Sequence, residues 1–336
     1  MEKHTFMILD MKNIFVTGGS GFLGGHLLYK LVINGHSPLA IKRKNSQLKN
    51  VKNIFLMNQK IHLYKKIQWE NCDLKNILKL EKKLEKIDTV FHCAGLVSFN
   101  KNDHDNIFET NYIGTKNLVN LCLKKSVNKF CHVSSIATLS NNETHQTLNE
   151  KNWFSFTKEK SNYAISKYLG EMEVWRGFSE GLNGFILNPS LIIGPGDTNS
   201  LFGKMTPKLK NGTLFYPNGG TGFVDVRDVA NILIELEKVN LNHERYIINS
   251  ENLSFKELLF LFAKKTNGIE PKFKIYNNII RFYIIINKLL NPYNKLSLSM
   301  VDFFKLKSNY CNQKIKKTLN YRFIPIKKSI CDIVSN

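Results

Sequence analysis

A tyrosine and a lysine four residues apart could carry proton chemistry in this chain. Tyr163 and Lys167 lie in SNYAISKYLGE (161–171), which predicts a helix beginning at Ser161 and running to about Glu180. A spacing of four places both side chains on one helix face. A phenol has a pKa of about 10, and a nearby ammonium group is expected to lower it. Tyr163 is therefore predicted to exchange a proton with a carbinol or carbonyl oxygen.

The spacing alone is weak support, because chance matches are frequent in a lysine-rich chain; Tyr112 and Lys116 match it too. A pair of hydroxyl groups adds weight. Ser134 and Ser135 end the predicted strand KFCHVSS (129–135). In open α/β folds, ligands bind at the carboxyl ends of the strands. One hydroxyl is expected to hydrogen-bond the reacting oxygen, and capping of the strand end is the alternative role.

A glycine-rich segment, TGGSGFLG (17–24), follows the first predicted strand and opens the first predicted helix. It satisfies both G-x-G-x-x-G and T-G-x-x-G-x-x-G, through Thr17, Gly18, Gly19, Gly21 and Gly24. The glycines allow a tight turn and let the backbone approach a pyrophosphate, which then lies on the helix N-terminus. The placement between strand and helix predicts a dinucleotide site rather than a plain tight turn.

The second predicted strand ends in cations where many dinucleotide-binding units place a carboxylate. PLAIKRKN (38–45) carries Lys42, Arg43 and Lys44. Arg43 is the informative residue, because arginine is rare among the 48 basic residues and its planar guanidinium suits a phosphate. Lys42 is predicted to point to the opposite side of the strand. The segment therefore favours NADP(H), with its 2′-phosphate, over NAD(H).

Alternating strand and helix patterns position these motifs. Strands are predicted over 12–18, 37–43, 69–74, 88–95, 129–135, 184–194 and the start of 223–236, and helices over 22–35, 77–87, 107–126, 161–180 and the rest of 223–236. Such repetition predicts an α/β, doubly wound parallel sheet of the Rossmann type. We predict a terminal extension (1–10), an NAD(P)-binding domain (11–190 plus 222–250) and a smaller, mostly helical substrate domain (191–221 plus 251–336).

Composition limits the class of protein. The chain has 336 residues, 43% hydrophobic residues and a formal net charge of +21. Nucleic acid or an anionic membrane would explain that charge, but the lysines are spread along the chain, which favours a compositional bias and no nucleic-acid partner. The six cysteines form no C-x-x-C pair, so we expect reduced thiols, no metal site and a cytoplasmic protein.

Two segments bear on membranes. The first ten residues lack the apolar core of a signal peptide, so none is expected. The segment IIRFYIIINKLL (279–290) is very apolar, but it contains Arg281 and Lys288 and is too short to cross a bilayer. It is predicted to be a helix of the substrate domain, with a helix at the membrane surface as the alternative.

Six motifs in order resemble one family. The resemblance rests on six motifs that occur in this order: TGGSGFLG (17–24), HCAG (92–95), NYIGTKNLV (111–119), SSIAT (134–138), YAISK (163–167) and NPSLIIGPGD (188–197). Over about residues 11–250, the chain resembles the extended short-chain dehydrogenase/reductases, also called the NAD-dependent epimerase/dehydratase family. The basic end of strand two, LVSF after HCAG, NYAISKYLGE and GFVDVRDVA (222–230) resemble its dihydroflavonol-4-reductase-like branch. The chain departs from the family pattern at two places. It has HCAG where H-x-A-A is commoner, and it has Leu139–Ser140 where an aromatic residue followed by Gly is usual after the serine strand.

The resemblance implies roles for single residues. The catalytic set is expected to be Ser135, Tyr163 and Lys167, with Ser134 as the alternative hydroxyl and Lys167 also on the nicotinamide ribose. Gly18, Gly21 and Gly24 are expected at the pyrophosphate, Asp73 at the adenine, Ala94 and Gly95 along the cofactor cleft, and Asn188, Pro189 and Ser190 beside the nicotinamide. Further cofactor contacts are expected from Thr17, Phe22, Leu23, Arg43, Lys44, Leu74, Asn111 and Ser134. Val97 and Arg227 are expected to contact substrate. Family likeness also implies a homodimer through helices 107–126 and 161–180.

Three functions fit these residues. A carbonyl reductase or alcohol dehydrogenase moves hydride between nicotinamide and a substrate carbon. A nucleotide-sugar epimerase uses the same residues and returns the hydride to the other face. A non-catalytic nucleotide-binding protein is the third, and the intact Ser, Tyr and Lys set weighs against it. The sugar dehydratases carry a carboxylate at the serine strand, which SSIATLS lacks. Arg43 favours the reductase over the epimerase. Residues 275–304, which are mostly Ile, Leu, Phe and Tyr interrupted by Lys, favour an apolar or aromatic alcohol or ketone as substrate.

Overall fold

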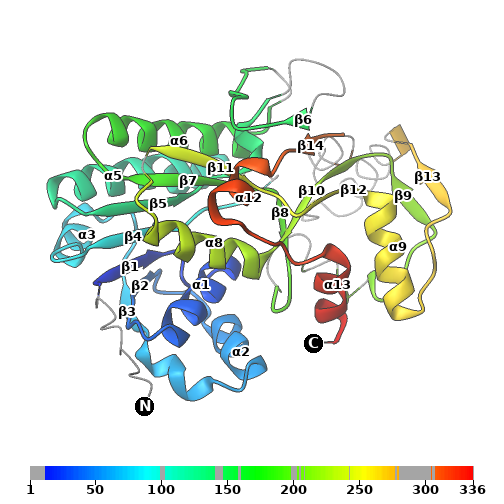
Figure 1. Ribbon diagram of the computed structural model, residues 1–336, viewed down its shortest axis with the longest axis horizontal. Helices are drawn as coiled ribbons and strands as arrows, with labels where there is room; N and C mark the ends of the chain where they lie inside the picture. The colour runs from blue at the N-terminus through cyan, green and yellow to red at the C-terminus, as the bar shows by residue number, and fades with distance from the viewer. Residues whose placement is uncertain are drawn as a thin grey trace, which may run out of the picture.

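The computed structural model describes residues 12–98, 103–140, 147–157, 160–197, 203, 206–207, 209–241, 243–276, 278–279, 304 and 307–335. The molecule contains a large sheet with helices on both sides and a smaller C-terminal region at one end of it (Figure 1). The predicted segment 279–290 lies outside the described residues, apart from Ile279. Within the described ranges, no helix is long and apolar enough to cross a membrane.

The large sheet has seven strands, and every neighbouring pair is parallel. From one edge to the other they are β3 (Gln68–Asn71), β2 (Leu39–Lys42), β1 (Ile14–Thr17), β4 (Thr89–His92), β5 (Lys129–Val133), β7 (Gly184–Pro189) and β11 (Glu244–Ile248). The chain order reverses between β1 and β4, so the crevice between their carboxyl ends is where such sheets bind ligands. The predicted doubly wound fold is confirmed.

Helices cover both faces of this sheet. One face carries α1 (Phe22–Ile33), α2 (Lys49–Met57) and α8 (Val226–Lys238); the other carries α3 (Ile77–Lys83), α5 (Gly114–Lys124) and α6 (Asn162–Ser179). Adjacent strand residues separate into the two cores: Val16 packs in the α1 cluster and Phe15 in the α5–α6 cluster. This alternation follows from the two-residue period of a strand and makes β1 fully buried, as its apolar sequence predicts.

Two predicted elements are divided in the structure. The helix predicted over 107–126 consists of α4 (His104–Phe108), a π-helical turn η3 (Glu109–Ile113) and α5. The strand predicted over 184–194 ends at Pro189, and the chain then enters a second sheet as β8 (Leu191–Ile193). Helix α2 and the 3-10 segment η1 (Ile61–Lys66), between β2 and β3, were not predicted from the sequence.

The second sheet consists of β8, β10 (Gly220–Asp225) and β12 (Glu251–Ser254), with β10 central. The domain boundaries predicted from the sequence pass through this sheet, because they separate most of β10 from β8 and β12. The C-terminal residues also return to the large sheet: α12 (Gln313–Leu319) packs on β11, and its Ile315 is buried in the α1 cluster.

The rest of the C-terminal region is small. Its elements are the parallel pairs β9 (Phe215–Pro217) with β13 (Phe273–Ile275) and β6 (Thr147–Leu148) with β14 (Asn309–Tyr310), and the helices α9 (Phe255–Thr266) and α13 (Ile326–Ser335). Helices α9 and α13 pack together around a third apolar cluster that contains Phe255, Phe262 and Ile330. This region contains strands as well as the predicted helices.

Candidate active site

The turn between β1 and α1 has the shape of a phosphate cradle. Gly18 has a φ of +68°, and a Cβ on Gly24 would lie 2.1 Å from the Gly18 carbonyl oxygen, so neither position tolerates a side chain. The Gly21 N–H donates to the Gly18 carbonyl at 2.9 Å and closes the turn. No side chain caps the N-terminus of α1, which begins after Gly21. Its first N–H groups therefore suit an anion, and this geometry fits the pyrophosphate of a dinucleotide.

A chain of buried hydrogen bonds joins the cradle to the next strand. Burial lowers the pKa of His92 to about 3, so its ring is neutral. Thr115 Oγ1 donates to the Asn111 carbonyl at 2.7 Å, which leaves it to accept from His92 Nε2 at 2.9 Å. His92 Nδ1 then accepts from Thr17 Oγ1 at 2.6 Å, and Thr17 accepts from the Ala94 N–H at 3.2 Å. The contacts fix one tautomer and lock the β4 end against the cradle.

Asn111, a predicted cofactor contact, has its side chain occupied by protein groups. Its Oδ1 accepts from the Leu96 N–H at 2.7 Å, and its Nδ2 donates to the Leu96 carbonyl at 2.9 Å and to Ser166 Oγ at 3.0 Å. The residue lies in the π-helical turn, which brings it over the loop after β4. Asn111 therefore orders the segment that contains Ala94, Gly95 and the exposed Val97.

Ser135, Tyr163 and Lys167 meet at the carboxyl end of β5. Ser135 lies between β5 and the short 3-10 helix η4 (Ile136–Thr138), and Tyr163 lies in the first turn of α6, whose N-terminus Ser161 caps as predicted. The Ser135 side chain is close enough to Tyr163 to lower its pKa, and Ser135 Oγ also accepts from the Ala137 N–H at 3.1 Å, which caps η4. Lys167 Nζ, one turn along α6, donates to the Val133 carbonyl at 2.7 Å. The sequence-predicted set is thus one constellation.

The proton affinities in this set differ in part from expectation. Burial raises the pKa of Tyr163, and the nearby Ser135 side chain offsets this only in part. The expected lowering by Lys167 is wrong for the protein alone, because the ammonium group is turned to the backbone of β5. Burial lowers the pKa of Lys167 to about 8, against opposing effects of Glu171 and Cys93. Lys167 is therefore close to the point at which it loses its charge.

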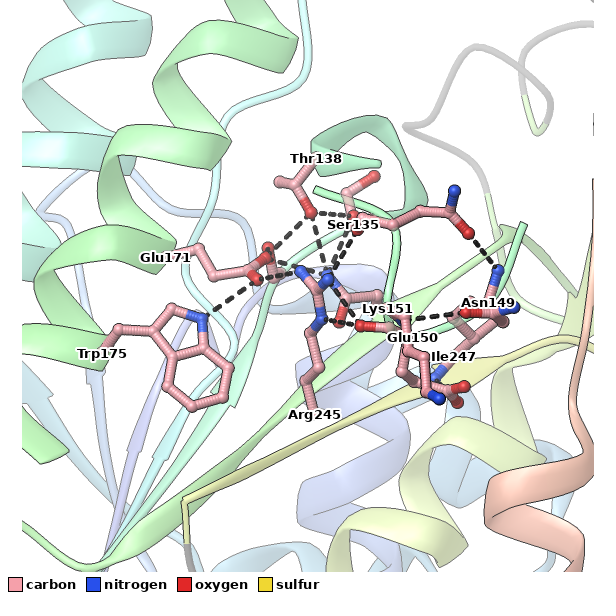
Figure 2. A network of polar contacts seen from close by, with 12 residues as sticks. Ser135, Thr138, Asn149, Glu150, Lys151, Glu171, Trp175, Arg245 and Ile247 are labelled. Carbon is pink, nitrogen blue, oxygen red and sulfur yellow. Dashed lines mark hydrogen bonds and ion pairs between the residues drawn. The ribbon is translucent and has the colours of Figure 1, made fainter. Parts of the chain in front are cut away.

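Glu171, one turn beyond Lys167, is a fully buried carboxylate that holds the serine loop (Figure 2). Its Oε2 accepts from Ser134 Oγ at 2.5 Å, Asn188 Nδ2 at 2.8 Å and Thr138 Oγ1 at 2.9 Å. Asn188 Nδ2 also donates to the Ser135 carbonyl at 3.1 Å. The Ser134 hydroxyl is thereby committed to Glu171. The Ser135 hydroxyl lies beside Tyr163 and also caps η4 by accepting from the Ala137 N–H, so the capping role considered for these serines applies to Ser135.

Arg245 on β11 compensates the charge of Glu171. Its Nη1 lies 3.3 Å from Glu171 Oε1, and both side chains are at most 4% exposed. The same guanidinium donates to the carbonyls of Glu150 and Asn152 and lies 4.2 Å from the ring of Trp153. Figure 2 shows Arg245 between Glu171 and Glu150. Arg245 therefore ties the segment before α6 to the sheet.

The cationic end of β2 lies beside the cradle, because β1 and β2 are adjacent and parallel. Arg43 and Lys44 are exposed, and no described carboxylate is paired with the Arg43 guanidinium. Lys42 instead donates to Asn71 Oδ1 on β3 at 2.7 Å, which agrees with its predicted opposite orientation. Asp73 lies after β3, where its Oδ1 accepts from the Lys75 N–H. Arg43 is thus an exposed cation at the end of β2 whose planar group is not paired with a described carboxylate.

Two further predicted residues have their polar groups occupied. The Ser190 hydroxyl donates to the Ile248 carbonyl at 3.2 Å, and Pro189 beside it is buried at the end of β7. Arg227, predicted to contact substrate, pairs with Asp225 Oδ2 and with Asp332 Oδ2, each at 2.7 Å. A substrate group at Arg227 would have to compete with two carboxylates.

Glu171 and Arg245 were not among the site residues predicted from the sequence. Glu171 had a usable signal, since it lies four residues after Lys167 and thus on the same helix face. For Arg245 the only signal in the sequence was that arginine is rare in this chain. Among the described residues, no group of His, Cys, Asp and Glu side chains suits a metal ion, and all six cysteines are free.

The cradle, the crevice and the Ser–Tyr–Lys set define a dinucleotide-dependent enzyme site on a Rossmann sheet. The NAD dependent epimerase/dehydratase family model matches residues 14–248, so the chain belongs to this family. It is accordingly an NAD(P)-dependent enzyme of the extended short-chain dehydrogenase/reductase type. The fold also matches a solved UDP-glucose 4-epimerase from Thermotoga maritima at a TM-score of 0.75 and 20% identity, covering 96% of this chain and 97% of that one.

Curated relatives extend over most of the chain. A putative dihydroflavonol 4-reductase of Synechocystis sp. is 27% identical over 335 residues, covering 95% of this chain and 93% of the relative. A bifunctional dihydroflavonol 4-reductase/flavanone 4-reductase of Pyrus communis is 28% identical over 324 residues, covering 91% and 92%. The resemblance to the dihydroflavonol-4-reductase-like branch is confirmed at this level of similarity.

Proposed function

We propose that the protein is an NADP(H)-dependent carbonyl reductase. The observation that carries the proposal is the contact of Ser135 with Tyr163 beside Lys167, at the sheet edge next to the glycine cradle. This arrangement presents two hydroxyl groups to one substrate oxygen and a cation one turn away. The relatives whose names describe reductases support the direction of the reaction.

The cofactor and the chain would divide the chemistry. A bound nicotinamide dinucleotide supplies the hydride, and the cradle holds its pyrophosphate. Ser135 hydrogen-bonds the substrate carbonyl oxygen, and Tyr163 donates its proton to that oxygen as negative charge develops there. Lys167 in its charged form stabilises the phenolate left on Tyr163. The buried Glu171 favours that charged form, since it raises the pKa of Lys167.

Arg43 supports NADP(H) as the cofactor. A guanidinium group binds a 2′-phosphate through charge-assisted hydrogen bonds, which are about twice as strong as neutral ones. Arg43 is exposed at the end of β2, beside the cradle, without a described carboxylate to compete for it. An enzyme that consumes NADPH must exchange its cofactor at every turnover, whereas an epimerase recovers it. Arg43 therefore connects the cofactor with the reaction type.

A nucleotide-sugar epimerase is the second candidate. It would use the same Ser135, Tyr163 and Lys167, and the fold is shared with a UDP-glucose 4-epimerase. The two reactions differ in net cofactor use, because only a reductase converts NADPH to NADP⁺ in proportion to product. A substrate with an apolar or aromatic body bearing the carbonyl is the class we propose, in keeping with the reductase relatives.

The experiment is a titration followed by turnover. NADPH and NADH are titrated into purified protein with fluorescence detection, and aromatic ketones and nucleotide sugars are then tested as substrates. NADPH is expected to bind more tightly, and ketone reduction to fall about 10²–10⁴-fold in Tyr163→Phe, the usual contribution of a general acid. Tyr168→Phe, on the next turn of α6, is the control. Equal binding of the two cofactors would reject NADP(H), and unchanged turnover would remove Tyr163 from the mechanism.

A further inference from the structure

A small two-stranded ribbon in the C-terminal region exposes large apolar side chains. The strands β9 and β13 pair in register, with Phe215 opposite Phe273 and their ring centroids 6.0 Å apart. Phe215 is 50% exposed, Phe273 58% and the following Tyr276 65%. Leu214 and Ile269 beside them are also exposed. Figure 1 shows β9, β13 and α9 together at the end of the molecule that lies away from β1 to β5.

Lysines surround these apolar side chains. On α9, Lys256, Phe260 and Lys264 follow one another at four-residue spacing on the exposed face, and the Lys264 ammonium lies over the Phe260 ring at 5.1 Å. The Lys256 ammonium lies 5.1 Å from the ring of Tyr216 on β9, so the helix face and the ribbon are continuous. Two more lysines flank Phe273 in the β13 segment, at 272 and 274.

We define the aromatic–lysine face as the exposed side chains Leu214, Phe215, Lys256, Phe260, Lys264, Ile269, Lys272, Phe273, Lys274 and Tyr276. Residues 209–217 and 255–276 contain six lysines and two glutamates. One of these, Glu257, is occupied in the capping box of α9 with Ser254. The face is therefore apolar at its centre and cationic at its rim.

We propose that the aromatic–lysine face binds the surface of an anionic lipid bilayer. Aromatic side chains are favoured at the boundary between headgroups and hydrocarbon, and lysine ammonium groups reach the lipid phosphates while their stems cover apolar surface. Clustered lysines gain attraction from the negative potential of anionic lipids. The lysines of this face contribute to the net charge of +21, and lipid binding would give that part of the charge a function.

A second copy of the chain fits this face less well. Two such faces would bring the four rim lysines of one copy against the four of the other. The repulsion between two chains of charge +21 acts in the same direction. An anionic bilayer supplies the opposite charge and an apolar layer together.

Co-sedimentation of the full chain with lipid vesicles tests the proposal. Vesicles of phosphatidylcholine with phosphatidylserine are expected to bind the protein, and vesicles of phosphatidylcholine alone to bind at least about tenfold less. Binding to the anionic vesicles is expected to weaken as salt is added, because exposed charges are screened. Binding that is equal on both kinds of vesicle, or absent from both, would overturn the proposal.

Paired variants locate the contact. Phe215→Ser with Phe273→Ser, and separately Lys272→Glu with Lys274→Glu, are each expected to reduce binding about tenfold or more. The matched controls are Leu56→Ser with Leu78→Ser, exposed apolar residues on α2 and α3, and Lys65→Glu with Lys66→Glu in η1. Controls that lose binding as strongly as the face variants would contradict the assignment.

Two readouts keep the result interpretable. Dinucleotide binding is measured for each variant, and it is expected to stay unchanged, because the face contains none of the proposed site residues. If the double serine variant does not fold, Phe273→Trp with vesicles of brominated lipid replaces it, and added quenching of fluorescence relative to the parent chain is expected. No added quenching would refute insertion. A change of solution mass in the face variants without any vesicle binding would identify a second copy as the partner instead.

Discussion

Two polar regions share one strand end and one helix, yet they differ in how completely their hydrogen bonds are made. The Glu171 region is buried, and we call it the dry region. Its carboxylate receives hydrogen bonds from four side chains and is paired with Arg245. The catalytic region is more open: Tyr163 is half-buried, and the neighbouring cofactor side has the uncapped N-terminus of α1 and the exposed Arg43. Neighbouring residues divide between the regions, since Ser134 faces Glu171 and Ser135 faces Tyr163.

The difference separates positioning from chemistry. A buried polar group must find partners, and a saturated network fixes its surroundings in one arrangement. Groups at the edge of a sheet that keep hydrogen-bonding capacity beyond their protein partners are the ones available for a ligand. By this criterion Ser134, Asn111, Ser190 and Arg227 act within the protein. The open set is expected to carry binding and catalysis.

The largest expected effect is on folding, from removal of the cation in the dry region. Arg245→Met leaves Glu171 buried and unpaired, and we expect the free energy of unfolding to fall by about 3–5 kcal/mol. The control is Arg176→Met on the exposed side of α6, where pairs with Glu173 and Glu180 are worth about 0–1 kcal/mol. Urea denaturation measures both. Equal losses in the two variants would contradict the contrast.

The neighbouring serines should respond in opposite ways. Ser135→Ala removes a hydrogen bond to the developing oxyanion, and we expect the kcat for ketone reduction to fall about 10²–10³-fold with little change in stability. Ser134→Ala removes a buried donor to Glu171, and we expect a loss of about 1–3 kcal/mol in stability while kcat stays within about tenfold. If Ser134→Ala gave the larger loss of kcat, the roles would have to be exchanged.

Arg43 is proposed to contact the 2′-phosphate of NADPH. Arg43→Asp removes a charge-assisted hydrogen bond worth about 1.5–3 kcal/mol, so NADPH affinity should fall about 10–100-fold while NADH affinity changes little. Lys49→Asp on α2 makes the same change in net charge and is the control. Fluorescence titration with both cofactors checks the result. An equal loss for NADPH and NADH would show that only general charge is involved.

The smallest expected effect is on the pH dependence, where the two regions meet. Lys167 is charged below its pKa of about 8, so ketone reduction should decline as the pH rises through about 8. Glu171 raises that pKa, and Glu171→Gln is therefore expected to move the decline to lower pH. Glu173→Gln, on the side of α6 that faces Arg176, is the control. If ketone reduction declined at the same pH in Glu171→Gln as in the parent chain, Glu171 would have no effect on the pKa of Lys167 that matters for turnover.

The sequence predicted much of the open region and little of the dry one. The cradle, Arg43 and the Ser135–Tyr163–Lys167 set are local motifs with fixed spacing, and the structure brings them to one sheet edge. The pair of Glu171 with Arg245 depends on β11 crossing near α6, which no local pattern reports. The division of 184–194 into β7 and β8 is hidden for the same reason, since the change of sheet occurs within one apolar run.

The pKa of Tyr163 illustrates a second limit. The four-residue spacing correctly places Lys167 on the same helix face, but it cannot report that Lys167 Nζ donates to the Val133 carbonyl. Burial then dominates and raises the pKa of Tyr163. Spacing along a helix thus predicts proximity, whereas proton affinity depends on solvation and on the final hydrogen-bond partner.

The central claim is that Tyr163 supports net transfer of hydride from NADPH to a ketone. The direct measurement uses NADPH deuterated at C4 of the nicotinamide, a panel of aromatic ketones and mass spectrometry of the products. We predict deuterium at the new carbinol carbon, one NADPH consumed for each alcohol formed, and loss of both in Tyr163→Phe. Interconversion of a nucleotide sugar without net loss of NADPH, or the same label transfer in Tyr163→Phe, would contradict the account.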